Sequence, residues 1–478
     1  MNRTCITAAA AAALLVAPTL PASAQSARTI SRSDKAQGAQ AHPQLLNEFG
    51  GAYAGPQAAF VERVGKRVAV QSGLSNAQGD FTVTLLDSSV ENAFAIPGGY
   101  VYVTRQLLAL MNSEAELAAV LGHEVGHVAA RHSNKRNTRA TLGGLLSAGL
   151  GWVTGSDLVG RLANTGSQLY TLGFSRSQEY EADGLGVRYA SAAGYDPYGM
   201  SAMLSQLNND QNLTARIEGR QADAVPTWAS THPNGADRVA RARQLAQGAR
   251  GTAASGVQDV AFLRMLDGLT YDDNPAQGVI DGQTFRHPQL RLQFTAPAGY
   301  KIANSADAVT VAGDGGQAQF RAAAATSDLP GFVRARLAEL GARSTNAVEL
   351  RAAQVNGLEM VQGTVSATSN GRAVDATVAA YRFPSATYYF LIVTPQGSRL
   401  GAFASLTSSV AQLSPQAAAA IKGKRIRIVT VKAGDTIDSL SRQMAYPDYQ
   451  RERFVTLNAL ENTSTLTPGR LVKLVVAG

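Results

Sequence analysis

The stretch "LGHEVGHVAARH", Leu121 to His132, contains the pattern H-E-x-x-H and decides how the rest of the chain is interpreted. On an α-helix, His123 and His127 lie one turn apart, so both imidazoles project from the same face and can hold one ion. Glu124 follows about 100° around the helix and can reach a water molecule beside the histidines. A buried helix whose histidines bond carbonyl groups is the competing interpretation. A third ligand is needed to decide between them.

The helix that carries this pattern has a recognisable start. Ser113 and Glu116 form an S-x-x-E capping box, which predicts that the helix begins there. Its residues are apolar around most of the circumference, as expected for a central buried helix. Gly122 and Gly126 lack side chains, so another backbone could approach the helix closely.

A second predicted helix offers the third ligand. The extended motif H-E-x-x-H-x-x-G-x-x-H would place its third histidine at position 133. That position is Ser133, and His132 stands one residue too early. The stretch "SRSQEYEADGLGVRYASAAG", Ser175 to Gly194, instead places Glu179 and Asp183 on one face. Glu179 can therefore bind a metal while Asp183 bonds a ligand histidine. Glu181 points to another side, and we interpret it as a solvated glutamate.

Two histidines and one glutamate leave the fourth position of a zinc ion open, as in catalytic sites. Imidazole and carboxylate suit zinc best, although this ligand set does not exclude other divalent metals. The expected cofactor is one zinc ion.

Two further segments complete a family pattern. "NAFAIPGGYVYVTRQLL", Asn92 to Leu108, precedes the first helix, and "STHPNGADRVARA", Ser230 to Ala242, follows the second. With the two metal-helix motifs, they resemble the gluzincin peptidases that include the HtpX heat-shock protease, the CAAX prenyl protease and periplasmic relatives. The resemblance covers about 200 residues. It implies a mainly α zincin-type (gluzincin) peptidase domain with a small sheet.

The resemblance also assigns roles to residues. It implies His123, His127 and Glu179 as zinc ligands and Glu124 as the catalytic base, which would take a proton from water and pass it to the leaving amine. For His232 three interpretations stay open. It could occupy the open zinc position in a resting state, stabilise the oxyanion, or simply stand in a loop that ends before the next helix.

The segment before the zinc helix is expected to bind substrate. "VYVT" after Pro97 is predicted to be a strand at a sheet edge, where a substrate backbone can be held by strand addition. The glycines of the turn would let substrate come close, and an ordinary hairpin turn is the alternative. The expected substrate-binding residues are Asn92, Ala93, Phe94, Gly98 and Gly99.

The first residues have the pattern of a secretory signal peptide. Arg3 supplies the positive start, an apolar stretch follows, and Ala22-Ser23-Ala24 offers a small-x-small cleavage site. We expect cleavage after Ala24 and a periplasmic location. The single cysteine, Cys5, lies within this segment, so zinc must be held by nitrogen and oxygen ligands.

Two stretches rich in small residues divide the 478-residue chain. They lie at Leu245 to Gly256 and Leu413 to Lys424. The expected parts are a signal peptide at 1–24, a zinc metallopeptidase domain at 28–248, an accessory α+β domain at 257–415 and a small βααβ domain at 424–478. The accessory domain at 257–415 alternates strand-like runs such as "TYYFLIVT" with few helices, which predicts an antiparallel sheet. Its role is unknown.

The last part resembles a LysM module, a type that binds N-acetylglucosamine chains such as those of peptidoglycan. A strand, "IVTV", leads into Gly434, Asp435 and Thr436, and helical stretches, Asn458 and a closing strand follow. These four residues are the expected sugar-binding residues. The charged connection "AYPDYQRER" departs from the pattern, so a module used for packing or partner contact is the alternative.

Charge and hydropathy limit the partners. The net charge of +8 is spread along the chain, which favours anionic surfaces such as cell wall or lipid headgroups and argues against nucleic acid. The uncharged stretch Ala140 to Ser156 is predicted to form a buried or interfacial hairpin rather than a membrane span. Contact with a membrane surface is left as a hypothesis.

These observations predict a periplasmic zinc endopeptidase that hydrolyses misfolded or misassembled envelope proteins. Two alternatives stay open. One is a non-catalytic, metal-stabilised holdase or scaffold at the cell wall. The other is a cell-wall peptide hydrolase, against which the absence of an H-x-H cluster argues.

Overall fold

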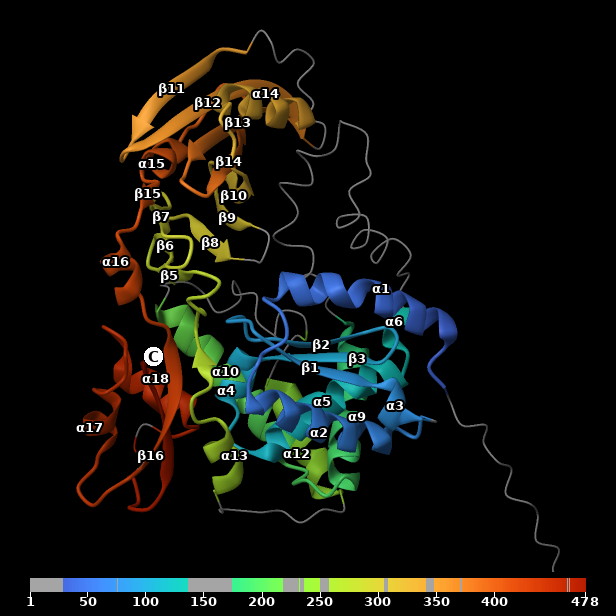
Figure 1. Ribbon diagram of the computed structural model, residues 1–478. Coiled ribbons are helices and arrows are strands. Elements are labelled where there is room, and N and C mark those ends of the chain that lie inside the picture. The colour runs from blue at the N-terminus through green and yellow to red at the C-terminus, as the bar shows by residue number, and fades with distance from the viewer. Residues whose placement is uncertain are drawn as a thin grey trace, which may run out of the picture.

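The computed structural model has an N-terminal, mainly helical part, a middle part built on a large sheet, and a small C-terminal module (Figure 1). The predicted signal peptide and the stretch Ala140 to Ser156 lie outside the described residues. Within the described part of the chain, no helix is both long and apolar enough to cross a membrane. The described residues are 29–74, 76–135, 174–217, 232, 236–249, 258–304, 308–340, 348–369, 372–461, 463 and 465–478.

The N-terminal part is mainly α-helical, as predicted. Its helices are α1 (Arg32–Glu48), α2 (Pro56–Ala69), η1 (Val70–Ser72), α3 (Ala77–Asp80), α4 (Arg105–Leu110), α5 (Glu114–Ala129), α6 (His132–Lys135), α9 (Arg176–Ala192), α10 (Gly199–Ile217) and α12 (Ala236–Gln247). Its strands are β1 (Thr82–Leu86), β2 (Ala93–Ile96) and β3 (Tyr100–Thr104).

The three strands form a small sheet in the order β1-β3-β2. β3 pairs with β1 in parallel and with β2 antiparallel. The prediction that "VYVT" forms the sheet edge is therefore wrong, because these residues lie in the central strand. The edge strands are β1 and β2, since the chain reverses through Pro97-Gly98-Gly99 and lays β3 between its two neighbours.

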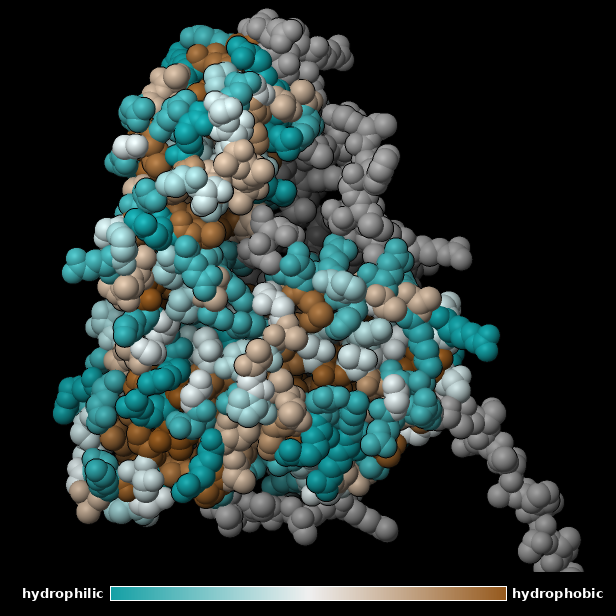
Figure 2. Space-filling view, viewed as in Figure 1, coloured by the Kyte–Doolittle hydropathy of each residue, from teal (hydrophilic) through white to brown (hydrophobic). Residues whose placement is uncertain are grey.

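Helices cover both faces of this sheet (Figure 1). Alternate residues of β2 and β3 point to opposite faces, so Phe94 and Tyr102 pack against α1 while Ala93 and Val103 join the core around α5. α2 lies on the α5 side with Val61, Val64 and Val68 fully buried. The outer face of α2 forms a hydrophilic patch in the space-filling view (Figure 2), as the 3.6-residue period of its valines requires.

The middle part is an α+β unit with antiparallel pairing, as predicted. Its seven-stranded sheet has the order β11-β12-β13-β14-β10-β9-β8, and a four-stranded sheet has the order β15-β7-β6-β5. α14 packs on one face of the large sheet, and the small sheet and α15 contribute to the core on the other face. The elements are β5 (Val279–Asp281), β6 (Thr284–His287), β7 (Leu292–Thr295), β8 (Lys301–Asn304), β9 (Val309–Gly313), β10 (Gly316–Ala324), α14 (Leu329–Glu339), β11 (Leu350–Val355), β12 (Leu358–Ser369), β13 (Arg372–Arg382), β14 (Ala386–Pro395), α15 (Phe403–Ser408) and β15 (Ala411–Gln412).

The C-terminal module has the predicted order of strand, helix, helix and strand. After α16 (Pro415–Ala420), it contains β16 (Lys424–Thr430), α17 (Ile437–Ser441), α18 (Gln450–Leu457) and β17 (Leu471–Ala477). β16 and β17 pair antiparallel, and β4 (Thr270–Tyr271) adds a third strand beside β16.

One hydrophobic core joins the N-terminal part to the C-terminal module. Phe454 and Val472 of the module belong to the same buried cluster as Leu117 of α5. α13 (Val260–Met265) also packs in this cluster through Phe262. The predicted start of the middle domain at residue 257 therefore differs from the structure, because the separate cores of the middle part begin only after β4.

Candidate metal centre

The helix α5 brings two histidines together at the centre of the N-terminal part. It begins where the sequence predicts, since the Ser113 side chain accepts a hydrogen bond from the backbone N–H of Glu116. His123 and His127 are at most 2% exposed, and their Nε2 atoms lie 2.9 Å apart. This pairing follows from their spacing of one helical turn.

The helix α9 supplies the carboxylate. Ser175 and Gln178 form a capping box that starts the helix, and Glu179 lies in its first turn, fully buried. Glu179 Oε2 is 3.5 Å from His123 Nε2, and Oε1 is 3.6 Å from His127 Nε2. The third expected ligand therefore lies beside the other two.

Glycines allow the two helices to pack closely enough for this contact. A Cβ atom added at Gly122 would lie 3.0 Å from the carbonyl oxygen of Gly186 in α9, and one at Gly126 would lie 3.0 Å from Leu185 Cβ. This confirms the prediction that another backbone approaches α5 at its glycines.

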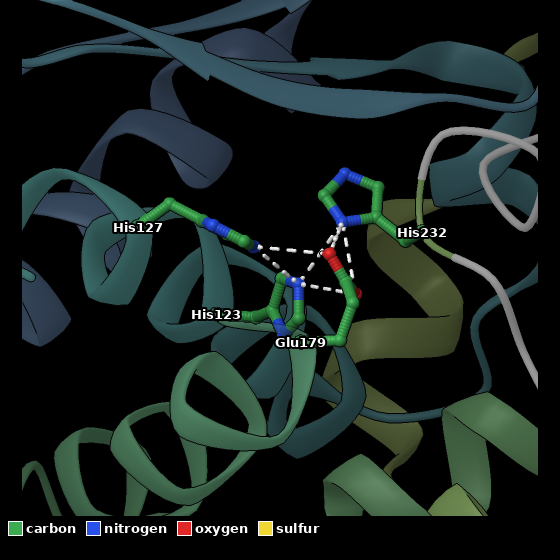
Figure 3. Close-up of side chains that lie close together, drawn as sticks. All are labelled: His123, His127, Glu179 and His232. Atoms are coloured by element: carbon green, nitrogen blue, oxygen red, sulfur yellow. Dashed lines mark hydrogen bonds and ion pairs between the residues drawn. The ribbon is translucent and has the colours of Figure 1, made fainter. Parts of the chain in front are cut away.

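His232 completes the cluster. Its Nδ1 atom lies 3.2 Å from His123 Nε2 and 3.1 Å from Glu179 Oε1. Figure 3 shows the four side chains pointing toward one another, with His232 reaching in from a segment outside both helices. One donor atom from each residue lies within 4.8 Å of every other.

This donor set fits zinc. Four donors at about 2.0–2.1 Å from a tetrahedral zinc ion are separated by about 3.3–3.4 Å. Five separations between donor atoms run from 2.9 to 3.6 Å, and all the donor atoms lie within 4.8 Å of one another. Three imidazoles and one carboxylate, all buried, are also a donor set that zinc prefers.

Asp183 and Arg238 orient the first histidine. Asp183 Oδ1 lies 3.0 Å from His123 Nδ1, on the ring edge opposite the cluster. Arg238 of α12 donates from Nε and Nη2 to the two oxygens of Asp183, at 2.8 and 2.7 Å. Its Nη1 donates to the His232 carbonyl oxygen at 3.0 Å and lies 3.1 Å from Glu179 Oε2. Arg238 thus ties α9 to the segment that carries His232.

The charges around the cluster favour ionised carboxylates. Burial alone would raise the pKa of Asp183, but hydrogen bonds from His123 and Arg238 lower it to about 2. Burial likewise opposes ionisation of Glu179, yet the charges of His232, His123 and Arg238 hold its pKa below the usual value. Ionised carboxylates are the form that binds a metal and orients an imidazole.

Glu124 lies beside the cluster without being part of it. Its side chain is fully buried, and Oε1 is 3.6 Å from His232 Nε2. The carboxylate therefore faces the side of the cluster that His232 occupies.

The expected substrate-binding residues fall into two groups. Asn92, Ala93 and Phe94 lie in or beside the edge strand β2, with Asn92 and Ala93 buried. Gly98 and Gly99 have positive φ angles of 94° and 87°, but their close neighbours lie within the chain. A Cβ at Gly98 would meet the Asp34 carbonyl of α1 at 2.8 Å, so the room expected for substrate is filled by α1.

The expected sugar-binding residues are also divided. Gly434 is exposed and Asp435 is half-buried in the turn before α17, and Thr436 caps that helix. Asn458 is buried, and its amide donates to the carbonyls of Phe454 and Lys473. Its side chain is thus used inside the module, and sugar binding stays a prediction for the turn alone.

Sequence reasoning missed three residues near the cluster. Arg238 lies within the quoted motif "STHPNGADRVARA", so its place in that motif was the available signal. His132 was rejected as a ligand on spacing, and it contacts the expected ligand His127 instead, with the two Nδ1 atoms 2.9 Å apart. Glu181 was interpreted as merely solvated, whereas its Oε2 lies 3.1 Å from His132 Nε2.

Comparison with known proteins agrees with this geometry. Residues 56–246 match the model of peptidase family M48. The chain is 31% identical over 211 residues to mitochondrial metalloendopeptidase OMA1 of Schizosaccharomyces pombe, covering 43% of this chain and 59% of that protein. It is 28% identical over 217 residues to the beta-barrel assembly-enhancing protease of Yersinia pestis, covering 43% and 42% of the two chains.

A third relative is metalloprotease LoiP of Escherichia coli (strain K12), 32% identical over 156 residues, covering 32% of this chain and 57% of that protein. The chain thus spans less than two thirds of the length of each of these relatives. The match lies over the whole metal centre, from α2 to α12. Residues 56–246 are thus similar to peptidase family M48, which confirms the resemblance inferred from the motifs and supports zinc as the metal.

Proposed function

We propose that this protein is a zinc-dependent endopeptidase. The observation that carries the proposal is the buried set of four donor atoms with the Glu124 carboxylate on its flank. His123, His127 and Glu179 would hold the ion. Zinc, when bound, would supply Lewis-acid chemistry that polarises a carbonyl group and acidifies water.

Glu124 would move the proton. Its buried carboxylate can accept a proton from water and return it to the leaving amine, as general base and then general acid. Arg238 and Asp183 would keep His123 in the ring orientation and protonation state that metal binding needs.

His232 would act as a fourth metal ligand that dissociates from the metal before catalysis. A catalytic zinc site keeps one position open, whereas His232 Nδ1 completes a four-donor set. We propose that the resting site is closed by the His232 side chain and opens when Nδ1 of His232 leaves the donor set. Cleavage that rises in His232→Ala would support this role, and cleavage that falls would instead support oxyanion stabilisation.

The substrate would bind along β2. An extended peptide can add to an exposed sheet edge through main-chain hydrogen bonds, and β2 is the edge strand that also contacts α5. We assign Asn92, Ala93 and Phe94 to this contact.

The proposed substrates are misfolded or misassembled proteins of the cell envelope, and the proposed location is the periplasm. The signal-like N-terminus and the similarity to the beta-barrel assembly-enhancing protease support this. Peptidoglycan binding by the turn at Gly434 to Thr436 and contact with a membrane surface are further proposals, which the distributed positive charge supports.

The decisive experiment compares the wild type with Glu124→Gln. An unfolded protein such as casein is the substrate, and zinc content is measured in both proteins. We expect one zinc in each and cleavage by the wild type alone, because glutamine keeps the shape but cannot accept the proton. Equal cleavage by both would exclude Glu124 as the base.

Zinc in both proteins without cleavage by either, together with unchanged binding of unfolded protein, would favour the metal-stabilised holdase. Cleavage of peptidoglycan peptides but not of casein would favour the cell-wall hydrolase.

A further inference from the structure

A histidine outside the donor set contacts one of the proposed ligands. α5 ends at Ala129, and Arg131 adopts a left-handed conformation with φ of 55°, so the chain turns before α6. The turn places His132, which is fully buried, beside the Nδ1 edge of the His127 ring, with the two Nδ1 atoms 2.9 Å apart. The other ring nitrogen of His132, Nε2, lies 3.1 Å from Glu181 Oε2 on α9.

When a metal is bound, the contact between His127 and His132 fixes which ring nitrogen of each histidine carries the proton. His127 faces the donor cluster through Nε2, so a metal there leaves its proton on Nδ1. That N–H can only donate to His132 if the Nδ1 atom of His132 is unprotonated. His132 must then carry its proton on Nε2, from which it donates to Glu181.

The two proposed ligand histidines are therefore oriented in different ways. His123 faces the carboxylate of Asp183 directly, and that carboxylate is held by Arg238. On its Nδ1 side, away from the cluster, His127 reaches the Glu181 carboxylate through His132, and the side chain of Glu181 is 52% exposed. The Phe174 ring stacks on His127 with centroids 3.9 Å apart, which restricts ring rotation but offers no hydrogen-bond acceptor in the ring plane.

We propose that His132, held by Glu181, is a positioning residue that fixes the tautomer and ring orientation of His127 and thereby raises the affinity for zinc. The inference rests on the proposed function only in taking zinc as the metal. It assigns a role to the last histidine of "LGHEVGHVAARH" that is neither ligation nor catalysis.

Zinc affinity and the stability of the zinc-free protein separate this role from simple packing. In His132→Asn, the Asn oxygen can take the place of Nδ1 and still accept from His127. In His132→Leu, the apolar side chain fills the space but accepts nothing. A packing role predicts that leucine is the better substitute by both measurements, because a buried apolar residue costs less than a buried amide.

We expect the opposite order for zinc affinity, with asparagine the better substitute for His132. The zinc dissociation constant, measured by chelator competition on the full chain, should rise by about 10- to 100-fold in His132→Leu, as for other groups that orient a metal ligand. His132→Asn should retain most of the zinc affinity. Its zinc-free form should nevertheless unfold at a temperature no higher than that of zinc-free His132→Leu. Glu181→Gln should weaken zinc binding less than His132→Leu, because the Gln oxygen can still accept from His132.

The control variant is His42→Phe. It removes another hydrogen-bonded histidine, whose Nδ1 lies 2.7 Å from the Tyr102 hydroxyl, on the α1 face of the sheet. We expect unchanged zinc affinity. Zinc affinity in His132→Leu equal to that of the wild type, or higher than in His132→Asn, would overturn the inference. Failure of the proposed peptidase function would appear separately, as tight zinc binding by the wild type without cleavage.

Discussion

At the scale of single residues, Arg238 joins three residues of the site that lie on two different segments of the chain. Its guanidinium spans both oxygens of Asp183, the carbonyl of His232 and a Glu179 oxygen while only 2% exposed. A planar fork of five N–H groups suits this arrangement, whereas an ammonium group is a point donor. The shape of the side chain therefore matters as much as its charge.

Arg238→Lys should weaken both the fold and the metal site. Lysine cannot bond both oxygens of Asp183 and still reach the other segment, so one buried carboxylate loses a partner. We expect a loss of about 2–4 kcal/mol in the free energy of unfolding of the zinc-free protein, and weaker zinc binding. Urea unfolding and chelator competition measure the two effects. Arg243→Lys, at an exposed position on the same helix, should change neither.

Glu91 and Asp210 form a half-buried pair of carboxyl groups, away from the metal. Glu91 precedes β2 and hydrogen-bonds Asp210 of α10. Burial and the charge of Asp210 raise the pKa of Glu91 well above its usual value, and burial raises the pKa of Asp210 to about 6. The native pair thus keeps a proton at a pH where the unfolded chain has released it.

This pair gives the protein a pH-dependent stability with a definite sign. Between about pH 4 and the raised pKa values, the native state binds more protons than the unfolded state, so the free energy of unfolding falls as pH rises. Glu91→Gln keeps a donor for Asp210 at every pH. We expect the variant to gain about 1–3 kcal/mol over the wild type between pH 4.5 and pH 8.

Chemical denaturation at several pH values tests this. Parallel stability profiles for Glu91→Gln and the wild type would contradict the assignment. Glu62→Gln, in an exposed pair with Lys66 on α2, is the control and should show no such divergence.

At the scale of elements, the distance between α5 and α9 sets the geometry of the metal site. The proposed ligands His123, His127 and Glu179 come from both helices, and the helices touch where glycines replace side chains. A Cβ at Gly122 would lie 3.0 Å from the carbonyl oxygen of Gly186 and 3.2 Å from its Cα, so the backbones would have to move apart. Glu179 would then move away from His123.

Gly122→Ala should therefore weaken zinc binding, by about tenfold or more if the separation grows by even a few tenths of an ångström. The matched control is Gly184→Ala on α9, where the nearest atom to an added Cβ is Leu245 Cδ1 at 4.0 Å. Alanine there should stabilise the helix by up to about 1 kcal/mol and leave zinc affinity unchanged. Similar zinc affinities in the two variants would show that helix spacing does not control the site.

At the scale of the whole molecule, the C-terminal module supports the zinc helix. The Lys473 ammonium of β17 is fully buried and donates to the carbonyls of Ala109, Leu110 and Met111, at 2.8, 3.2 and 2.7 Å. These carbonyls close α4 just before α5 begins. The charge of Glu116 in the first turn of α5 also favours the charged lysine.

Lys473→Met should destabilise the N-terminal part and the module together. Methionine fills the space but leaves the carbonyls without this donor and Glu116 without a counter-charge, which should cost about 3 kcal/mol. Burial lowers the pKa of Lys473 to about 7, so the comparison belongs at pH 6, where the group is charged.

Hydrogen exchange would locate the effect of Lys473→Met. We expect faster exchange in α4, α5 and β17 at once, because they share a core. Lys432→Met, at an exposed lysine in the same module, should leave exchange unchanged. Faster exchange confined to β17 would mean that the module is independent of the zinc helix.

The sequence by itself determined the local parts of the site. The spacing of His123 and His127, the capping box at Ser113 and the position of Glu179 four residues before Asp183 are properties of one helix each, because helical periodicity fixes which residues share a face. The small glycines on α5 predicted a close helix contact for the same reason. The order of strands and helices in the C-terminal module was also readable from its pattern.

Tertiary structure decided which elements meet. β2 rather than β3 lies at an edge of the sheet because strand order depends on how the chain folds back. Residue periodicity does not specify strand order. α1 rather than substrate lies against Gly98, and the C-terminal module joins the core of the zinc helix through Lys473. His132 and Glu181 come together only because α5 ends in a turn beside α9. Such contacts join residues far apart in the chain, so only packing in three dimensions specifies them.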